Sequence, residues 1–344
     1  MSALRDGFEA VLAGRSLDAV EAERAIGEML DGGEPAPEAL VAAFLIALKL
    51  KGESAGELTG GARAMRARAR VLNLNRGNVL DTAGTGGDRA ATFNISTGAA
   101  LIAATAGVPV AKHGNRAVTG RVGAADVLER MGVKIDLDPA GLERCLAAAG
   151  ICFIFAPAYH PALARLGPLR RVLGTRTVFN LIAPLANPAR PRRQLLGVAD
   201  AKLLRPIAEA LVALGVDHAM VVHGCDGLDE ISPGAPTRVA ESRGREEIRE
   251  YEIAPDDFGL GRNAPETLAA ADAARATAML TAALAGGAGP AQDVLALNAG
   301  AAIYVGGKAQ SLKSGVALAR DIIASGRALE TIEKMRAASR AKEP

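Results

Sequence analysis

Aromatic residues are scarce in this sequence: there is no tryptophan, and phenylalanine and tyrosine together make up 3% of the 344 residues. Few rings are therefore present on which nucleic-acid bases could stack. A core has to be built from aliphatic side chains, and the hydrophobic fraction of 49% is large enough to exclude general disorder. This composition suits helices packed on a buried sheet.

Cysteine and excess charge are also scarce. The three cysteines have no CxxC spacing, so neither a disulfide framework nor a zinc site follows, and we expect a reducing compartment. With 40 basic and 38 acidic residues the formal net charge is +2, which argues against a general polyanion binder. We interpret the arginine-rich stretch 63–70 as a solvated helix face and expect no nucleic-acid partner.

Long hydrophobic runs are absent as well. The apolar run at residues 39–48 is too short to span a bilayer. Residues 1–9 mix acidic and basic side chains before any long apolar run, which is unlike a secretory signal. We therefore expect a cytoplasmic protein with no membrane partner.

Residues 1 to about 70 predict helices and no strands. We expect Ser16 to cap a helix that ends near residues 32–33, and a second helix to run from Glu38 to Lys51 and end at Gly52. The second helix is apolar on nearly all faces, and in so small a domain a second subunit could bury it. We therefore expect a homodimer formed through the N-terminal helices.

From residue 78 onward, short apolar runs alternate with helical patterns. The expected strands are 79–81, 108–111, 151–156, 194–198 and 218–222, and the helices between them include 97–106, 124–131, 142–149 and 202–214. This alternation predicts an α/β fold with a mainly parallel central sheet covered by helices. Ligands of such sheets bind beyond the carboxyl ends of the strands.

Two segments near the first strand can bind anions. The turn Gly84–Asp88 has three glycines in four positions, so its backbone N–H groups can approach a ligand closely. For the turn alone, a purely structural strand-to-helix connection is equally compatible with the pattern. Residues 94–97 begin a helix, where they can cap the helix or help its N-terminus to bind an anion. Two such segments so close together suggest a ligand with more than one phosphate.

Two further polar clusters follow expected strands. Segment Lys112–Arg116 places a lysine, a histidine, an asparagine and an arginine around one glycine, a set that fits an anionic ligand better than it fits packing. Asp229 and Glu230 follow the strand at 218–222. Mg²⁺ prefers a few carboxylates completed by water and substrate phosphates, so we interpret this pair as magnesium ligands.

Together these segments resemble the signature segments of the anthranilate phosphoribosyltransferases. The similar segments are GTGGD at 84–88, TFNIST at 92–97, KHGNR at 112–116 and GLDEIS at 227–232. The resemblance continues through APAYHPA at 156–162, LGTRTVFN at 173–180 and the N-terminal helices. It covers nearly the whole chain in the expected order, which makes it more specific than any single motif.

The resemblance implies a fold and an activity. The fold would be a small all-helical N-terminal domain, residues 1–72 joined by part of 165–190, beside a large α/β domain, residues 73–344, with the active site at their junction. The enzyme would transfer the 5-phosphoribosyl group from 5-phosphoribosyl 1-diphosphate to the amine of anthranilate and release pyrophosphate, in L-tryptophan biosynthesis. It would use Mg²⁺, two ions per monomer.

The resemblance also implies site residues, although none as a nucleophile or an essential base. The phosphoribosyl diphosphate would be bound by Gly84, Gly87, Asp88, Thr92, Asn94, Ile95, Ser96, Thr97, Lys112, His113, Gly114, Asn115, Arg116, Thr119, Gly120 and Ala124. The anthranilate would be bound by Gly84, His113, Asn115, His160 and Arg170. The magnesium ligands would be Ser96, Asp229 and Glu230.

The sequence departs from the family pattern in several places, which include residues 270–272, where the usual paired glycines are absent. Val122 and Ala124 stand where serines are usual, and Ala183 stands where the family has a glycine. These departures leave open a paralogue that uses a different aromatic amine. The sequence is also compatible with a pyrimidine nucleoside phosphorylase, which is similar in fold but has a different basic motif, and with a non-catalytic nucleic-acid-binding relative of the same fold.

Overall fold

Four α-helices form the N-terminal domain of the structure, a computed structural model that describes residues 2–31, 36–74, 77–88, 90–116, 122–244 and 247–341. The helices are α1 (Ala3–Leu12), α2 (Ala19–Leu30), α3 (Glu38–Lys51) and α4 (Ala55–Ala67). The prediction that Ser16 caps the helix that precedes α3 is wrong. Asp18 is the N-cap, because its carboxylate accepts hydrogen bonds from the backbone N–H groups of Val20 and Glu21.

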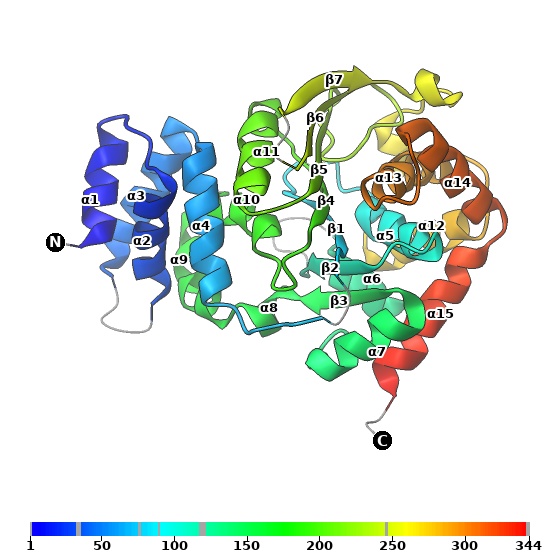
Figure 1. Ribbon diagram of the computed structural model, residues 1–344, viewed down its shortest axis with the longest axis horizontal. Coiled ribbons are helices and arrows are strands. Elements are labelled where there is room, and N and C mark those ends of the chain that lie inside the picture. The colour runs from blue at the N-terminus through cyan, green and yellow to red at the C-terminus, as the bar shows by residue number, and fades with distance from the viewer. Residues whose placement is uncertain are drawn as a thin grey trace.

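A segment from the middle of the chain packs against these helices. It comprises α9 (Gly167–Leu173) and α10 (Val178–Ile182), and it follows the short helix α8 (Ala156–Tyr159). Helix α9 contacts α3, and α10 contacts both α3 and α4. Phe179 and Ile182 of α10 belong to the same apolar core as Phe44 of α3. Helices far apart in the sequence therefore share one core on this side of the molecule (Figure 1).

A seven-stranded sheet forms the centre of the second domain. Its strands are β1 (Leu80–Gly84), β2 (Val110–Gly114), β3 (Ile151–Phe155), β4 (Arg193–Gly197), β5 (His218–Gly224), β6 (Thr237–Arg243) and β7 (Arg249–Ile253). The spatial order is β3-β2-β1-β4-β5-β6-β7. The first five strands pair in parallel, and β6 and β7 continue the sheet antiparallel at one edge. The expected mainly parallel α/β sheet beside a helical domain is thus confirmed.

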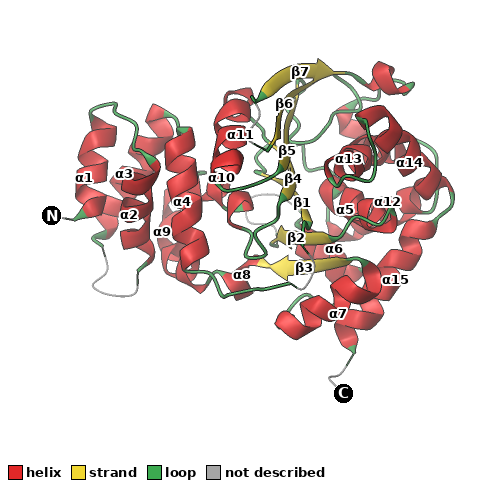
Figure 2. Ribbon diagram, viewed as in Figure 1, coloured by secondary structure: helices red, strands yellow, loops and turns green. Residues whose placement is uncertain are grey.

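Helices cover both faces of this sheet (Figure 2). On one face lie α5 (Ile95–Thr105), α6 (Ala124–Arg130), α7 (Pro139–Ala149), α12 (Ala273–Leu284), α13 (Pro290–Val305), α14 (Leu312–Ala324) and α15 (Arg327–Arg340); on the other lies α11 (Leu204–Ala213). Successive residues of a strand alternate between the faces. On β4, Leu195 joins the core of the first face, and Leu196 joins the core shared with α11 and the helical domain.

Two arginines of α4 connect the helical domain to α11. Arg66 donates from Nε to the carbonyl of Leu185 at 2.9 Å and from Nη1 to that of Leu214 at 3.5 Å, and Arg63 donates to the carbonyl of Ala213 at 3.4 Å. Burial lowers the pKa of Arg66 to about 10. The interpretation of stretch 63–70 as a solvated helix face is therefore wrong for Arg63 and Arg66. These guanidinium groups stabilise the carboxyl end of α11, where unpaired carbonyls carry partial negative charge.

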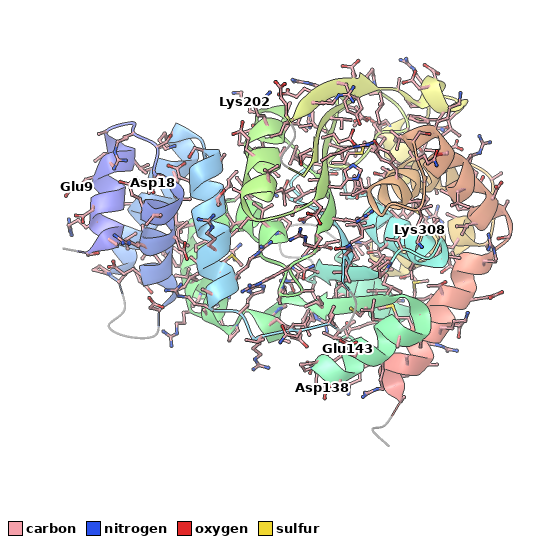
Figure 3. The ribbon with its side chains drawn as sticks, viewed as in Figure 1. Glu9, Asp18, Asp138, Glu143, Lys202 and Lys308 are labelled. Atoms are coloured by element: carbon pink, nitrogen blue, oxygen red, sulfur yellow. The ribbon has the colours of Figure 1, made fainter. Side chains whose placement is uncertain are left out.

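The remaining charges of both signs are spread around the molecule. The labelled side chains of Glu9, Asp18, Lys202 and Lys308 are exposed and lie in separate parts of the chain (Figure 3). In the part of the chain that is described, no helix is both long enough and apolar enough to cross a membrane.

Candidate active site

The glycine turn Gly84–Asp88 follows β1 at the point where the strand order reverses. Strand β1 pairs with β2 on one side and with β4 on the other, so successive crossovers leave it in opposite directions. Parallel sheets bind ligands at such switch points. Here a cavity of about 720 Å³ opens beside the turn, lined by residues of the α/β domain and by Met65, Arg170 and Phe179 of the helical side. Its volume is typical of a small-molecule site.

The structure brings most of the expected site residues to this one cavity. Thr97 is an exception, because it is buried within α5 and does not line the cavity. Thr119 and Gly120 lie outside the described residues. The expected residues that line the cavity are Gly84, Gly87, Asp88, Thr92, Asn94, Ile95, Ser96, Lys112, His113, Gly114, Asn115, Arg116, Ala124, His160, Arg170, Asp229 and Glu230.

Glycine is required in the turn because the neighbouring chain is so close. Gly87 has a φ of 94°, a left-handed value that favours glycine. A Cβ atom added to Gly84 would lie 2.4 Å from Oδ2 of Asp229. The turn can therefore lie directly against the loop that follows β5 because it lacks side chains at these positions.

Three carboxylates gather at this end of the cavity. Asp229 accepts a hydrogen bond of 2.6 Å from the backbone N–H of Gly86 through Oδ2. Burial and the negative charge of Asp88 raise the pKa of Asp229 to about 7. Loss of water and the charges of Asp229 and Asp88 likewise raise the pKa of Glu230 well above its ordinary value. So concentrated a negative charge favours a bound cation.

The donor set fits magnesium together with a phosphate ligand. Among the described residues, no three histidine, cysteine, aspartate or glutamate side chains are grouped closely enough to hold a metal ion by themselves. Mg²⁺ commonly binds through one or two carboxylates and takes its other ligands from water and substrate phosphates. Asp229, Glu230 and the hydroxyl of Ser96 could therefore hold the ion once a phosphate is present.

Lys112 is held rigidly between β1 and α5. Its Nζ donates to the carbonyl of Thr82 at 2.5 Å and to Oγ of Ser96 at 3.1 Å. Burial lowers the pKa of this lysine, and the nearby carboxylates of Asp81 and Glu230 oppose that shift. The ammonium group is thus placed at the N-terminus of α5, which itself attracts anions.

The other end of the cavity contains two neighbouring histidines. The ring centroids of His113 and His160 are 5.1 Å apart, and both side chains are buried. Burial lowers the pKa of His160 to about 4. Burial, together with repulsion from the protonated form of His160 and from Lys112, lowers the pKa of His113 well below its ordinary value. Both rings are therefore neutral at pH 7. Each has a buried Nε2 atom without a hydrogen-bond partner among the described residues.

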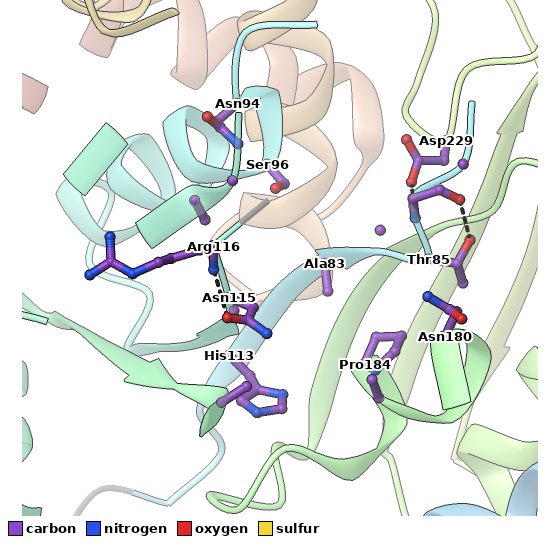
Figure 4. Close-up of a pocket in the computed structure, with 18 of the residues that line it drawn as sticks. Ala83, Thr85, Asn94, Ser96, His113, Asn115, Arg116, Asn180, Pro184 and Asp229 are labelled. Carbon is purple, nitrogen blue, oxygen red and sulfur yellow. Dashed lines mark hydrogen bonds between the residues drawn. The ribbon is translucent and has the colours of Figure 1, made fainter. Parts of the chain in front are cut away.

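Figure 4 shows that the two ends are separate. Asn94, Ser96 and Asp229 lie at one end of the view, and His113 and Pro184 at the other. Arg170 also lines the cavity and lies over the ring of Phe179, with its guanidinium carbon 5.8 Å from the ring centroid.

Arg116 adopts an arrangement that the sequence does not predict. Its guanidinium donates to both oxygens of Glu129, one of them at 2.8 Å, and its guanidinium carbon lies 5.7 Å from the ring centroid of Phe155. In Figure 4 this group points away from Asp229. Arg116 thus borders the cavity while its charge is paired with α6.

The cavity is also lined by residues outside the set expected from sequence, among them Arg176, Asn180 and Pro184, and by Ala183, which the sequence marks only as a departure from the family pattern. Segment 173–180 contributes to the resemblance, but it carries no strand end or glycine cluster that marks a ligand site. One available signal is Arg176 itself, a cation two residues before the apolar helix α10.

Comparison with known proteins agrees with this geometry. Residues 5–69 match the family model described as "Glycosyl transferase family, helical bundle domain", and residues 76–329 match "Glycosyl transferase family, a/b domain". The chain thus has the helical and a/b domains of the glycosyl transferase family.

Individual relatives define the family more closely. An anthranilate phosphoribosyltransferase of Rubrobacter xylanophilus is 50% identical over 98% of both chains, and one of Clostridium kluyveri is 46% identical over 96% of this chain and 98% of its own. A solved structure of this enzyme from Thermus thermophilus has a TM-score of 0.91 and 41% identity, covering 99% of this chain and 100% of its own. The chain belongs to the anthranilate phosphoribosyltransferase family.

Proposed function

We propose that this chain transfers the 5-phosphoribosyl group of 5-phosphoribosyl 1-diphosphate to the amine of anthranilate, in tryptophan biosynthesis. One observation carries the proposal: a single cavity has an anion-binding, carboxylate-rich end and an end with two neutral histidines and an arginine. A Saccharomyces cerevisiae anthranilate phosphoribosyltransferase, 25% identical with a TM-score of 0.86 over 98% of this chain and 97% of its own, is described as a complex with PRPP and Mg.

The diphosphate would bind at the carboxylate-rich end. The N–H groups of turn 84–88 and the N-terminus of α5 would donate to its oxygens, and Lys112 would add positive charge. Asp229, Glu230 and Ser96 would hold magnesium, for which we propose two ions per monomer. The bound metal would neutralise charge that develops on the leaving oxygen.

Anthranilate would bind at the histidine end. The guanidinium of Arg170 can pair with a carboxylate in two parallel hydrogen bonds. The unpartnered Nε2 of neutral His113 can accept a hydrogen bond from the arylamine. These two contacts would direct the amine nitrogen toward the ribose carbon. The yeast enzyme in complex with 4-fluoroanthranilate, 24% identical to this chain, adds support for the fold alone.

The reaction needs positioning more than covalent catalysis. The lone pair of the neutral arylamine forms the new bond to the anomeric carbon while the bond from that carbon to the diphosphate oxygen breaks. Pyrophosphate leaves with the electron pair, and the amine releases one proton. Holding the two reactants in line can supply about 7–11 kcal/mol of the barrier.

A fluorescence assay tests the proposal directly. Loss of anthranilate fluorescence should require the folded protein, 5-phosphoribosyl 1-diphosphate and Mg²⁺ together. Consumption of a substituted or different aromatic amine but not anthranilate would favour the paralogue that Ala183 leaves open. The bacterial and yeast relatives are anthranilate phosphoribosyltransferases, and they give neither a nucleic-acid-binding role nor a nucleoside phosphorylase any support.

We also propose a cytoplasmic homodimer formed through the helical domain. Leu50 of α3 is 82% exposed and Val172 of α9 is 85% exposed, which is unusual for aliphatic side chains of two helices in contact. All three cysteines are free, as in a reducing compartment. Sedimentation should give a dimer that Leu50→Asp dissociates, whereas Val71→Asp, at an exposed position beyond α4, should leave it intact. A monomeric wild type would contradict the dimer.

A further inference from the structure

Consecutive residues of the loop between α9 and α10 reach into both domains. Thr175 accepts a hydrogen bond from Nζ of Lys49 on α3 through its hydroxyl. The next residue, Arg176, donates from Nη2 to the carbonyl of Thr85 in the glycine turn at 2.7 Å. The bond between Arg176 and Thr85 spans 91 positions of the sequence. The loop thus links the helical domain to the phosphate-binding turn at a single point.

Arg176 packs directly against the turn. A Cβ atom added to Gly87 would lie 2.4 Å from Nη1 of Arg176 and 2.6 Å from its guanidinium carbon. The guanidinium can occupy this place because Gly87 has no side chain. Arg176 also lines the cavity, and the carboxylates of Asp88 and Asp229 attract its charge.

The other cations of the cavity have different tasks. Lys112 is bound to Thr82 and Ser96, and Arg116 is paired with Glu129. Arg170 lies over Phe179 and is exposed to the cavity from the helical side. Arg176 differs from all three because it both bonds to the backbone of the turn and brings a positive charge to the carboxylate-rich end.

We propose that Arg176 is a further residue for binding the ribosyl diphosphate, which positions the turn 84–88 through the Thr85 carbonyl and supplies positive charge from the helical domain. The inference rests on the proposed function, since it assigns the diphosphate to this end of the cavity. Arginine suits the role because its planar group can bond to a carbonyl on one edge and present further N–H donors to an anion on another.

The test compares three variants with the wild type. Arg176→Ala should raise the KM for 5-phosphoribosyl 1-diphosphate at least about tenfold and leave the KM for anthranilate nearly unchanged, because a lost charge-assisted hydrogen bond has an effect of this size. Arg170→Ala should instead raise the KM for anthranilate and leave the KM for 5-phosphoribosyl 1-diphosphate nearly unchanged. Arg171→Ala is the matched control, since this exposed arginine of α9 does not line the cavity, and both KM values should stay within about twofold.

A second readout needs no turnover. Calorimetry with inorganic pyrophosphate and Mg²⁺ should show weaker binding to Arg176→Ala by a similar factor, and Arg176→Lys, which keeps the charge but not the planar fork, should recover part of the loss. Unchanged pyrophosphate binding in folded Arg176→Ala overturns the inference. If Arg176→Ala does not fold, Arg176→Lys decides the question. Pyrophosphate binding by folded Arg176→Lys that is as tight as in the wild type overturns the positioning role.

The two proposals fail in distinguishable ways. A wild type that binds pyrophosphate with Mg²⁺ but does not consume anthranilate would refute the acceptor, and pyrophosphate binding would still decide the role of Arg176. A wild type that binds no pyrophosphate would refute the diphosphate site and the role of Arg176 together.

Discussion

The carboxylate of Asp229 lies 2.6 Å from the backbone nitrogen of Gly86, although 143 positions separate the two residues in the sequence. The bond joins the loop after β5 to the turn after β1, across the intervening strand β4. A loop that carries carboxylates is thereby held against a turn that presents N–H groups. The two parts of the proposed diphosphate site are positioned by each other.

Loss of the two carboxylates of this loop should abolish turnover. Replacing Asp229 and Glu230 together by alanine removes the proposed metal ligands, so kcat/KM at millimolar Mg²⁺ should fall by at least about a hundredfold. The rate at which anthranilate fluorescence is lost measures kcat/KM. The matched control is the double replacement of Asp256 and Asp257, an exposed acidic pair, which should retain activity. Full activity in the first variant would refute the metal site.

Gly197 should not tolerate a side chain. A Cβ atom there would lie 1.6 Å from the backbone oxygen of Asp229, so Gly197→Ala forces the loop after β5 away from the sheet. We expect a loss of about 1–3 kcal/mol in the free energy of unfolding, measured with urea, and weaker pyrophosphate binding. Gly77→Ala is the control, because a Cβ atom at Gly77 has no neighbour within 4 Å. Equal stability of the two variants would contradict this close approach.

Asn187 should be important for stability although it does not line the cavity. Its Nδ2 donates to Oδ2 of Asp81 and to the carbonyl of Ala111, both at 2.9 Å, and all three groups are buried. Asn187→Ala leaves a buried carboxylate without this partner, so we expect a loss of about 1–3 kcal/mol in urea unfolding. Asn263→Ala, at a less buried amide, should cost under about 1 kcal/mol. A smaller effect at Asn187 than at Asn263 would contradict the role of this bond.

Protonation of Glu241 should make the folded protein less stable in acid. Burial alone would raise its pKa, but hydrogen bonds from His218, Tyr251, Tyr304 and Arg243 outweigh burial and lower the pKa to about 2. The folded state thus binds the proton more weakly than the unfolded state, whose glutamate has the ordinary pKa of 4.5. The contribution of ionised Glu241 to the free energy of unfolding is present above pH 4.5 and is lost as the pH falls toward 2. The loss is up to about 3 kcal/mol.

Urea unfolding at several pH values measures this dependence. Glu241→Gln should be less stable than the wild type at pH 7 and should lose less stability between pH 4.5 and pH 2. Glu252→Gln, on the exposed side of β7, should follow the wild-type curve. If the free energy of unfolding of Glu241→Gln fell with pH as steeply as that of the wild type, other groups would cause the acid sensitivity.

The five parallel strands were predictable from sequence, but β6 and β7 were not. A strand covered on both faces reads as a continuous apolar run, as in Ile151–Phe155. Strand β6 instead carries Arg238, Glu241 and Arg243, and its buried charge is tolerated because partners from β5, β7 and α13 surround it. Those partners are distant in sequence, so the local pattern contains no trace of the strand.

The same reasoning explains which parts of the site were found. Turn 84–88 and segment 112–116 stand directly after apolar runs, where parallel strands place their ligands. Arg176 has no such position, and its role depends on a carbonyl 91 positions away. Arg116 lies in an expected motif, yet its pairing with Glu129 depends on how α6 packs. A motif at a strand end can be recognised from the local sequence. The pairing of side chains depends on how distant segments pack.

The apolar core shared by α11 and the helical domain extends from Leu4 of α1 through Phe179 of α10 to Leu196 and Ala240 of the sheet. The two family models meet between residues 69 and 76, but this core crosses that boundary. The segments that the two family models match therefore share one core, and we expect them to unfold as one cooperative unit. Hydrogen exchange should protect α3, α10 and α11 to a common level, and a mutation in the helical bundle should loosen the face of the sheet that packs against α11.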